Sequence, residues 1–408
     1  MKTSICIVFS LAIIMTSCEK SGKMYHRPDG EGGNQLVPAT EIGKPLPKWQ
    51  EGYLDIHHIN SARGECTFYI LPDGTTMLVD AGETTLDIPP RPNSSVPAYE
   101  VYGKYIKYFM PQGHLNLDYM LLSHFHIDHM GSSSIREAAA DGYVHTGVSA
   151  VYDLVKFDRL IDRGYPNYEA DVTIGAPDTD AMPNYRLFVK KLEEEKKVSL
   201  SRFEVGSSSQ FALLYKPSEY KCKITNIVGN GYVLGKDESG NPVVKTGGVL
   251  SGGNPNSCGF HLAYGNFDYI ACGDLTSSAQ NLMASNYYSN YITSLEVFKG
   301  NHHLVSNSWG SGMRSAGFTA QVVTAMSNGA ADASVVEYVI NLPSDVFLTN
   351  LPQKVLDAYP VFSQCKGYNG HIVVRVAKGG GQFFVYLLDD TDMSYNIKAI
   401  YGPYISYN

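Results

Sequence analysis

Short apolar runs bounded by turn residues predict several strands along the chain. Such runs lie at 119–122, 371–376 and 383–388, and a further strand-like stretch covers 260–264. Gly379-Gly380-Gly381 separates two of these runs. This glycine segment predicts the turn of a β-hairpin in the C-terminal part of the chain.

Apolar residues at helical spacing predict a helix over 185–197 and a shorter helix near 353–356. No internal repeat or heptad run accompanies this mixture of strands and helices. A chain of 408 residues is long enough for more than one minimal domain, but the motifs described below span nearly all of it. We therefore expect one large α/β domain with insertions.

The first residues have the pattern of a secretory signal. Lys2 is followed by an apolar run over 5–15 and then by Thr16-Ser17-Cys18. The run is too short for a membrane-spanning helix. A cysteine directly after Met-Thr-Ser resembles the lipobox of bacterial lipoproteins, which implies a signal peptide over 1–17 and a lipid anchor on Cys18 in the bacterial cell envelope. A signal cut elsewhere, giving a soluble secreted protein, is the alternative.

Residues 18–50 are expected to form a lipidated tether to the membrane. Their composition is polar and rich in glycine and proline, and such a segment cannot bury enough surface to fold alone. The folded domain is then expected over 51–408.

The run His124-Phe125-His126-Ile127-Asp128-His129 places three imidazoles and a carboxylate directly after a predicted strand. Imidazole nitrogen and aspartate oxygen are the usual ligands of zinc and similar divalent ions. Because side chains alternate along an extended segment, His124 and His126 are expected to bind one ion together. Asp128 and His129 follow where the chain turns into a helix, and they are expected to hold a second ion.

Two ions about 3.5–4 Å apart form the usual two-metal hydrolytic site. A bound divalent ion lowers the pKa of its water from about 15.7 to about 7, which gives hydroxide near neutral pH. Asp128 is expected to orient this water as a catalytic residue in addition to binding metal. The motif therefore predicts a metal-dependent hydrolase that uses a metal-bound hydroxide at a dinuclear site.

The motif resembles the signature of the metallo-β-lactamase superfamily of hydrolases. Upstream, Leu78-Val79-Asp80-Ala81-Gly82 is similar to the superfamily's first motif, a strand ending in an aspartate that braces the site. Three other segments resemble the branch found in bacterial DNA-uptake competence proteins. They are an opening hairpin over 62–74, a strand pair ending in Gly273-Asp274, and a late strand followed by His302-His303.

The resemblance implies a four-layer αββα sandwich of two mixed β-sheets, the metallo-β-lactamase fold. Compared with the superfamily core, the domain over 51–408 is expected to carry an insertion at about 132–254 and a β-hairpin extension at its C-terminal end. The resemblance also implies that Asp274 bridges two metal ions and that Asp80 braces the ligands. A late ligand is expected from His302 or His303, and we favour His302 because it lies nearer to the strand end. Zinc is the expected metal, and the resemblance to the competence-protein branch leaves manganese as an alternative.

The sequence departs from the superfamily in two places. Members with a full first metal site usually supply a third histidine between the histidine-rich motif and the later aspartate, and here His145 and His261 lie in that interval. Either is a candidate ligand, although a structural role is the better interpretation. The competence branch continues its His-His pair with Gly-Ser, whereas Leu304-Val305 follow here. The third ligand of the first ion therefore stays open.

Several of these residues have structural interpretations as well. Asp274 precedes a predicted helix start, where aspartate is a favoured N-cap. Asp80 fits an ordinary Asp-Ala-Gly turn. Glu65 is expected to be a solvated turn acid, and His57 and His58 are expected to be structural.

The resemblance to the competence-protein branch implies a phosphodiester or a related ester as the class of substrate. The competence-protein resemblance makes nucleic acid a candidate partner. The formal net charge of −8 and the lack of a dense Lys/Arg stripe do not support it, because nucleic-acid binding depends on neutralising phosphates. The alternative function is a catalytically degenerate lipoprotein that keeps the fold and acts as a binding protein. The oligomeric state stays open.

Overall fold

The computed structural model describes residues 40–85, 88–168, 181–248, 250–326, 331–342 and 344–407. All of them belong to one compact unit, Leu36–Asn408. The expected signal peptide, residues 1–17, and the expected lipidation site, Cys18, lie outside the described residues. No helix within the described ranges combines the length and the apolar character that crossing a bilayer requires.

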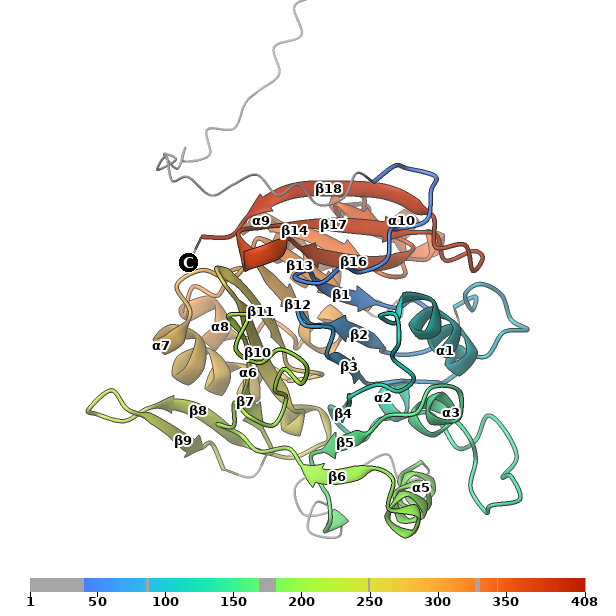
Figure 1. The fold of residues 1–408 in the computed structure, drawn as a ribbon. Helices are drawn as coiled ribbons and strands as arrows, with labels where there is room; N and C mark the ends of the chain where they lie inside the picture. Colours follow the sequence, from blue (N-terminus) through green and yellow to red (C-terminus); the bar gives the residue numbers. More distant parts are fainter. Residues whose placement is uncertain are drawn as a thin grey trace, which may run out of the picture. The chain divides into compact units, whose positions relative to one another are not determined.

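Two mixed sheets form the centre of the unit (Figure 1). The first sheet consists, in pairing order, of β18 (Ile397–Ile405), β17 (Gln382–Leu388), β16 (His371–Val376), β1 (Leu54–His58), β2 (Thr67–Ile70), β3 (Thr76–Val79), β4 (Tyr119–Leu122), β5 (Arg159–Asp162) and β6 (Ser199–Arg202). The second sheet consists, in pairing order, of β15 (Gly367–Tyr368), β14 (Asp345–Leu348), β13 (Val322–Ala325), β12 (Val297–Lys299), β11 (Phe267–Ala271), β10 (Gly259–Tyr264), β7 (Cys222–Gly229), β8 (Tyr232–Lys236) and β9 (Pro242–Thr246).

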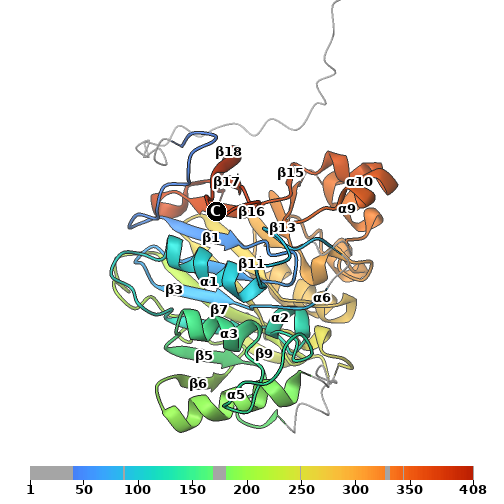
Figure 2. The same ribbon diagram turned by 90° about the vertical axis from the view of Figure 1, so that its right-hand side faces the viewer.

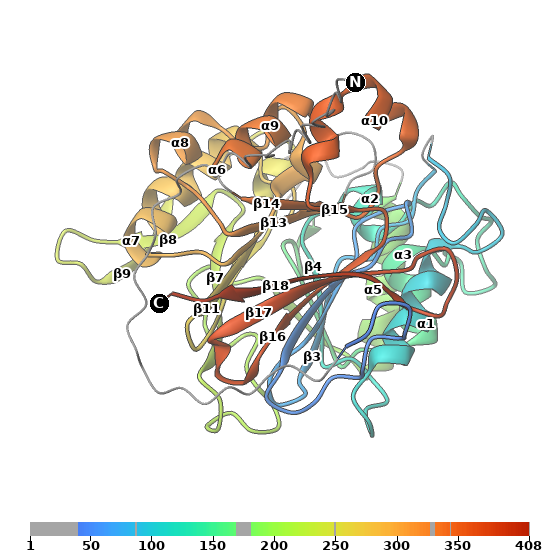
Figure 3. The same ribbon diagram turned by 90° about the horizontal axis from the view of Figure 1, so that it is seen from above.

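The helices lie on the outer faces of the two sheets (Figures 2 and 3). Those on the first sheet are α1 (Ala98–Phe109), α3 (Gly147–Leu154) and α5 (Met182–Glu195). Those on the second sheet include α6 (Ser277–Met283), α8 (Ser311–Ser315) and α9 (Ala333–Asn341). The remaining α-helices of the described chain are α2 (Ile127–Met130), α7 (Ser289–Tyr291) and α10 (Gln353–Ala358).

Three hydrophobic layers show how the sequence produces this sandwich. Along β4, Met120 and Leu122 pack toward the helices of the first sheet, whereas Tyr119 and Leu121 pack between the two sheets. This is the period-two alternation of a strand that is buried on both faces. A third apolar layer joins the second sheet to its own helices. The fold is therefore the four-layer αββα sandwich that was predicted.

The C-terminal strands form part of the first sheet itself. The predicted hairpin is confirmed as β16 and β17, and β16 pairs antiparallel with β1. The last strand, β18, was not predicted, because only one of its nine residues is buried and Gly402-Pro403 interrupts its apolar pattern. Residues 132–254, which were expected as an insertion, supply strands to both sheets.

The end of the expected tether contacts the folded unit. Gly43 N–H donates to the Ile397 carbonyl oxygen over 2.8 Å, and the Leu46 side chain is 1% exposed. The folded unit therefore includes residues before 51, some of which were assigned to the tether.

The candidate site lies where parallel strands end. β3 pairs parallel with β4, and β11 pairs parallel with β12. The carboxyl ends of such strands form the usual place for a site in an α/β sheet. Asp80 follows β3, Ser123-His124 follow β4, and Asp274 lies three residues after β11.

Candidate metal centre

The histidine-rich motif leaves β4 and enters α2, with His126 at the N-cap position. The Asp-Ala-Gly loop lies directly against it, and Ala81 N–H donates to the His129 carbonyl oxygen over 2.8 Å. A Cβ atom on Gly82 would lie 1.7 Å from the Asp128 carbonyl oxygen. Glycine is therefore required at residue 82, because the two loops approach each other through their backbones.

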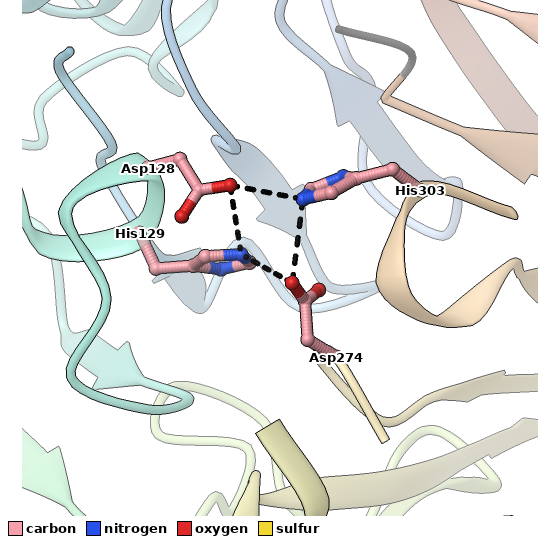
Figure 4. Close-up of side chains that lie close together, drawn as sticks. All are labelled: Asp128, His129, Asp274 and His303. Carbon is pink, nitrogen blue, oxygen red and sulfur yellow. Dashed lines mark hydrogen bonds and ion pairs between the residues drawn. The ribbon is translucent and has the colours of Figure 1, made fainter. Parts of the chain in front are cut away.

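Four side chains from three segments converge in a group that could hold a metal ion: Asp128, His129, Asp274 and His303 (Figure 4). Their candidate ligand atoms all lie within 4.8 Å of one another. His303 Nε2 is 3.1 Å from Asp128 Oδ2 and 3.3 Å from Asp274 Oδ2, and His129 Nε2 is 3.2 Å from Asp274 Oδ2. The Asp128 side chain is 21% exposed, whereas the other three are at most 3% exposed.

The other predicted ligands lie beside this group. His124 Nε2 is 3.9 Å from Asp274 Oδ2, and the His126 ring centroid is 4.7 Å from that of His124. His302 Nε2 is 4.0 Å from Asp274 Oδ2. The sequence favoured His302 as the late ligand, whereas the turn brings His303 closer to Asp274 and places it in the group of four. Which of the two binds metal stays a prediction.

The far nitrogens of the buried imidazoles have acceptors of their own. His129 Nδ1–H donates to Asp80 Oδ2 over 2.8 Å, and His303 Nδ1–H donates to the Met326 carbonyl oxygen over 3.1 Å. These bonds orient each ring so that its Nε2 faces the Asp274 carboxylate. This is the arrangement found in most metal-binding histidines, whose second nitrogen is held by a carboxylate or a carbonyl.

Asp80 organises the floor of the centre. Its carboxylate accepts hydrogen bonds from Ser123 N–H (2.7 Å) and Ser123 Oγ–H (2.8 Å) as well as from His129. Ser123 Oγ in turn accepts from His124 Nδ1–H over 3.1 Å. The backbone of Asp80 is left-handed, with φ of 60°, so this residue both makes the turn after β3 and orients two imidazoles.

Asp274 is placed by the turn that precedes it. Gly273 has φ of 52°, a conformation that glycine adopts without strain. Asp274 N–H donates to Ser257 Oγ over 3.1 Å. The N-cap of α6 is Thr276, so the Asp274 carboxylate contacts histidines instead of capping that helix.

The pKa values of the group reflect its mixture of carboxylates and imidazoles. Burial alone lowers the pKa of His303, but Asp274 and Asp128 outweigh burial and raise it to about 10. Burial alone raises the pKa of Asp128, but His129 and His303 lower it to about 2. Burial, with the neighbouring His129 and His126, holds the pKa of His124 well below its usual value. Positive charge is therefore favoured at the centre of the group.

A buried ion pair lies under the group. Lys299 Nζ is 3.3 Å from Glu65 Oε2, and Glu65 Oε2 is 3.7 Å from His303 Nδ1. The expectation that Glu65 is a solvated turn acid is wrong, because its side chain is 1% exposed. The role of Lys299 was not predicted, although a lysine at the end of the apolar strand Val297–Lys299 was a signal.

His145 and His261 lie away from the centre. Both nitrogens of His145 contact carboxylates, those of Asp141 and Asp153. His261 Nδ1 bonds to Tyr287 Oη over 2.8 Å and its Nε2 bonds to Asp268 Oδ1 over 2.7 Å. The structural interpretation of both histidines therefore agrees with their contacts.

The residues present fit a divalent cation. His124 Nε2 and Asp274 Oδ1 are buried and have no hydrogen-bond partner within the described part of the chain. Unpaired buried polar atoms are costly, and a bound cation would satisfy both. A donor set of imidazoles and carboxylates suits zinc and related first-row metals.

No family model and no curated protein matches the chain. Among solved structures, it is similar to a metallo-beta-lactamase from Cronobacter sakazakii, the HARLDQ motif mutant S60, at 11% identity and a TM-score of 0.31, over 79% of this chain and 97% of that chain. It is also similar to a protein of unknown function from Enterococcus faecalis V583 at 9% identity and a TM-score of 0.29. That match covers 76% of this chain and 64% of the other.

Proposed function

We propose that the chain is a metal-dependent hydrolase of the metallo-β-lactamase superfamily and that two divalent ions bind around Asp274. One observation carries the proposal. His124, His129 and His303 have Nδ1 held by protein acceptors, and their Nε2 atoms lie within 3.9 Å of Asp274 Oδ2. Preorganised nitrogens of this kind are typical of metal sites.

The ligands divide into two sets around the shared Asp274. His124 and His126 would hold the first ion, while Asp128, His129 and His303 would hold the second. Zinc fits this donor set, and manganese fits its carboxylates. When bound, the ions supply Lewis acidity and a hydroxide nucleophile near neutral pH.

The protein's own groups have separate roles. Asp128 is the most exposed carboxylate of the group and is proposed to orient the attacking water. Asp80 and Ser123 hold the imidazole rings in their orientation. Lys299 offsets part of the buried carboxylate charge through Glu65, and the nearby carboxylates outweigh burial to raise its pKa.

We propose a small phosphodiester or a related ester as the substrate. The resemblance to the competence-protein branch supports a phosphodiester. The net charge of −8 and the lack of a basic stripe argue against polymeric nucleic acid. The N-terminal pattern ending in Cys18 supports anchoring of the protein by lipid in the bacterial cell envelope.

The test is turnover of bis-p-nitrophenyl phosphate by the purified full chain. We expect activity to disappear on chelation and to return with zinc. Asp128→Asn should lower turnover by at least about 100-fold with an unchanged circular dichroism spectrum. Asp141→Asn, which alters an aspartate outside the centre paired with Lys191, should keep wild-type turnover.

Turnover that persists without metal, or in Asp128→Asn, would contradict the proposed site. A metal-loaded chain that hydrolyses neither phosphodiesters nor esters would favour the binding-protein alternative.

A further inference from the structure

His302 is the predicted ligand that the four-residue group leaves out, yet it lies beside that group. His302 Nε2 and His124 Nε2 are almost equally far from Asp274 Oδ2, at 4.0 and 3.9 Å. The His302 side chain is 21% exposed, so it lies at the border between the centre and the solvent.

The hydrogen bonds of His302 select the tautomer that binds metal. Its Nδ1–H donates to Asn307 Oδ1 over 2.9 Å, which leaves the lone pair on Nε2. Asn254 Nδ2–H donates to that lone pair over 3.0 Å. A histidine with one nitrogen held by an amide oxygen and the other presented as an acceptor has the form of a ligand.

The loop that contacts His302 also contacts His126. A Cβ atom on Gly253 would lie 2.6 Å from His126 Nε2, so Gly253 lies directly against that imidazole. The next residue, Asn254, bonds to His302. One dipeptide therefore touches both imidazoles.

The backbone at this point is unusual and explains how two adjacent histidines reach one centre. His302, His303 and Leu304 have φ of 45°, 55° and 59°. Left-handed residues other than glycine usually occur singly, so a run of three is unusual. Gly300 makes the turn fit, because a Cβ atom there would lie 2.6 Å from Leu304 Cδ2. In an extended strand, adjacent side chains would face opposite sides.

We propose that His302 is the third imidazole of the first ion's site, together with His124 and His126. It would take the place of the histidine that the chain lacks between the histidine-rich motif and Asp274, since His145 and His261 are bound elsewhere. The inference rests on the proposed function, because it assigns a ligand to an ion that the proposed function requires. Without metal, the Asn254 side-chain amide donates a hydrogen bond to His302 Nε2, and a bound metal ion would replace this hydrogen bond.

The test is zinc stoichiometry and affinity of the full chain, with the visible absorption of the cobalt-substituted protein as a second readout. We expect two ions in the wild type and one in His302→Ala, with the loss of one cobalt absorption component. Asn307→Ala should keep the ligand but lower the affinity of the weaker ion by about 10- to 100-fold. His261→Ala, which removes a partly buried histidine bonded to Asp268, should bind two ions as the wild type does.

Two ions with wild-type affinity and an unchanged cobalt spectrum in His302→Ala would overturn this inference and leave the proposed function standing. A wild-type chain that binds no metal would instead overturn the proposed function itself. If His302→Ala does not fold, Asn307→Ala decides, and an unchanged zinc affinity in that variant overturns the inference.

Discussion

In the part of the chain that the structure describes, two buried clusters of histidine and aspartate differ in the groups that balance their charge. In the first cluster, Arg375 donates to both oxygens of Asp55, from Nε over 2.8 Å and from Nη2 over 2.6 Å. Burial lowers the pKa of the adjacent His57, although Asp55 partly opposes this shift. All three side chains are at most 1% exposed. A permanent cation therefore neutralises this carboxylate.

The metal centre is balanced in another way. Within the described residues, every ion pair of Asp128 and Asp274 is made with a histidine. An arginine keeps its proton at all ordinary pH values, whereas an imidazole can release its proton and bind a metal through the same nitrogen. The difference indicates that the first cluster supports the fold, while the second can exchange protons for a cation.

The largest effect is expected from a substitution that disrupts the metal centre. Asp274→Asn should reduce turnover by about 10³-fold or more, because it weakens the only carboxylate that both ions are proposed to share. The metal-free protein should be less stable, because His129 and His303 outweigh burial and hold the pKa of Asp274 well below its usual value, so the charged carboxylate contributes stability. Turnover and thermal unfolding of the metal-free protein check both expectations, and wild-type turnover in this variant would contradict the assignment.

The second-largest effect is expected from a substitution that disrupts the cluster of Asp55, His57 and Arg375. Arg375→Met leaves the fully buried Asp55 without its cation and should destabilise the fold by about 3–5 kcal/mol. Zinc content per folded chain should stay at the wild-type value. Urea unfolding combined with metal analysis of the folded fraction measures the two quantities separately. A loss of metal from chains that remain folded would show that the clusters are coupled.

A third effect concerns acid. The pKa of Asp55 is about 2, because Arg375 outweighs the effect of burial, and its unfolded value is about 3.9. A lowered folded pKa contributes stability above the unfolded pKa, here about 2–3 kcal/mol, which is lost as the pH falls from about 4 through about 2. The double variant Asp55→Asn/Arg375→Met should lose less stability over this range. Equal acid sensitivity in both proteins would exclude this ion pair as the cause.

The smallest effect sharpens the description of the centre. Asp80→Asn keeps the size of the side chain but weakens its hold on His129 and Ser123. We expect zinc affinity to fall by about 10- to 100-fold, as is typical when the partner of a metal-binding histidine is altered. Competition with a chromogenic chelator measures this change. An unchanged affinity would mean that Asp80 serves the turn alone.

Several strands were predictable because they are short apolar runs bounded by turn residues, whereas the four-layer arrangement followed from the resemblance to the superfamily. One such run is 119–122, which forms β4, and its side chains alternate between the two hydrophobic layers on either side of the strand. The sequence did not reveal β18, which has few buried positions. Glu65 was wrongly expected to be solvated. Its burial depends on its ion pair with Lys299, a residue of a distant strand, and the local sequence around Glu65 does not reveal that contact.

The centre was predictable as a set of residues but not in its internal order. The motif at 124–129 gathers ligands on one loop, and its contact with Asp274 depends on the pairing of distant strands. Whether His302 or His303 lies nearer to Asp274 depends on a left-handed turn. A glycine in the sequence would have indicated such a turn, but here the non-glycine residue Leu304 adopts the left-handed conformation. The contacts of Asn254 and Asn307 with His302 had no signal in the sequence.

The central claim is that the nitrogens and carboxylates around Asp274 form a centre for two divalent ions. Elemental analysis of the purified full chain, with bis-p-nitrophenyl phosphate turnover read from the same sample, tests it most directly. We predict about two zinc or manganese ions per chain, lost together with turnover on chelation. The account would be contradicted if the folded chain, with chemically unmodified histidines, bound neither zinc nor manganese at micromolar concentrations of the metal.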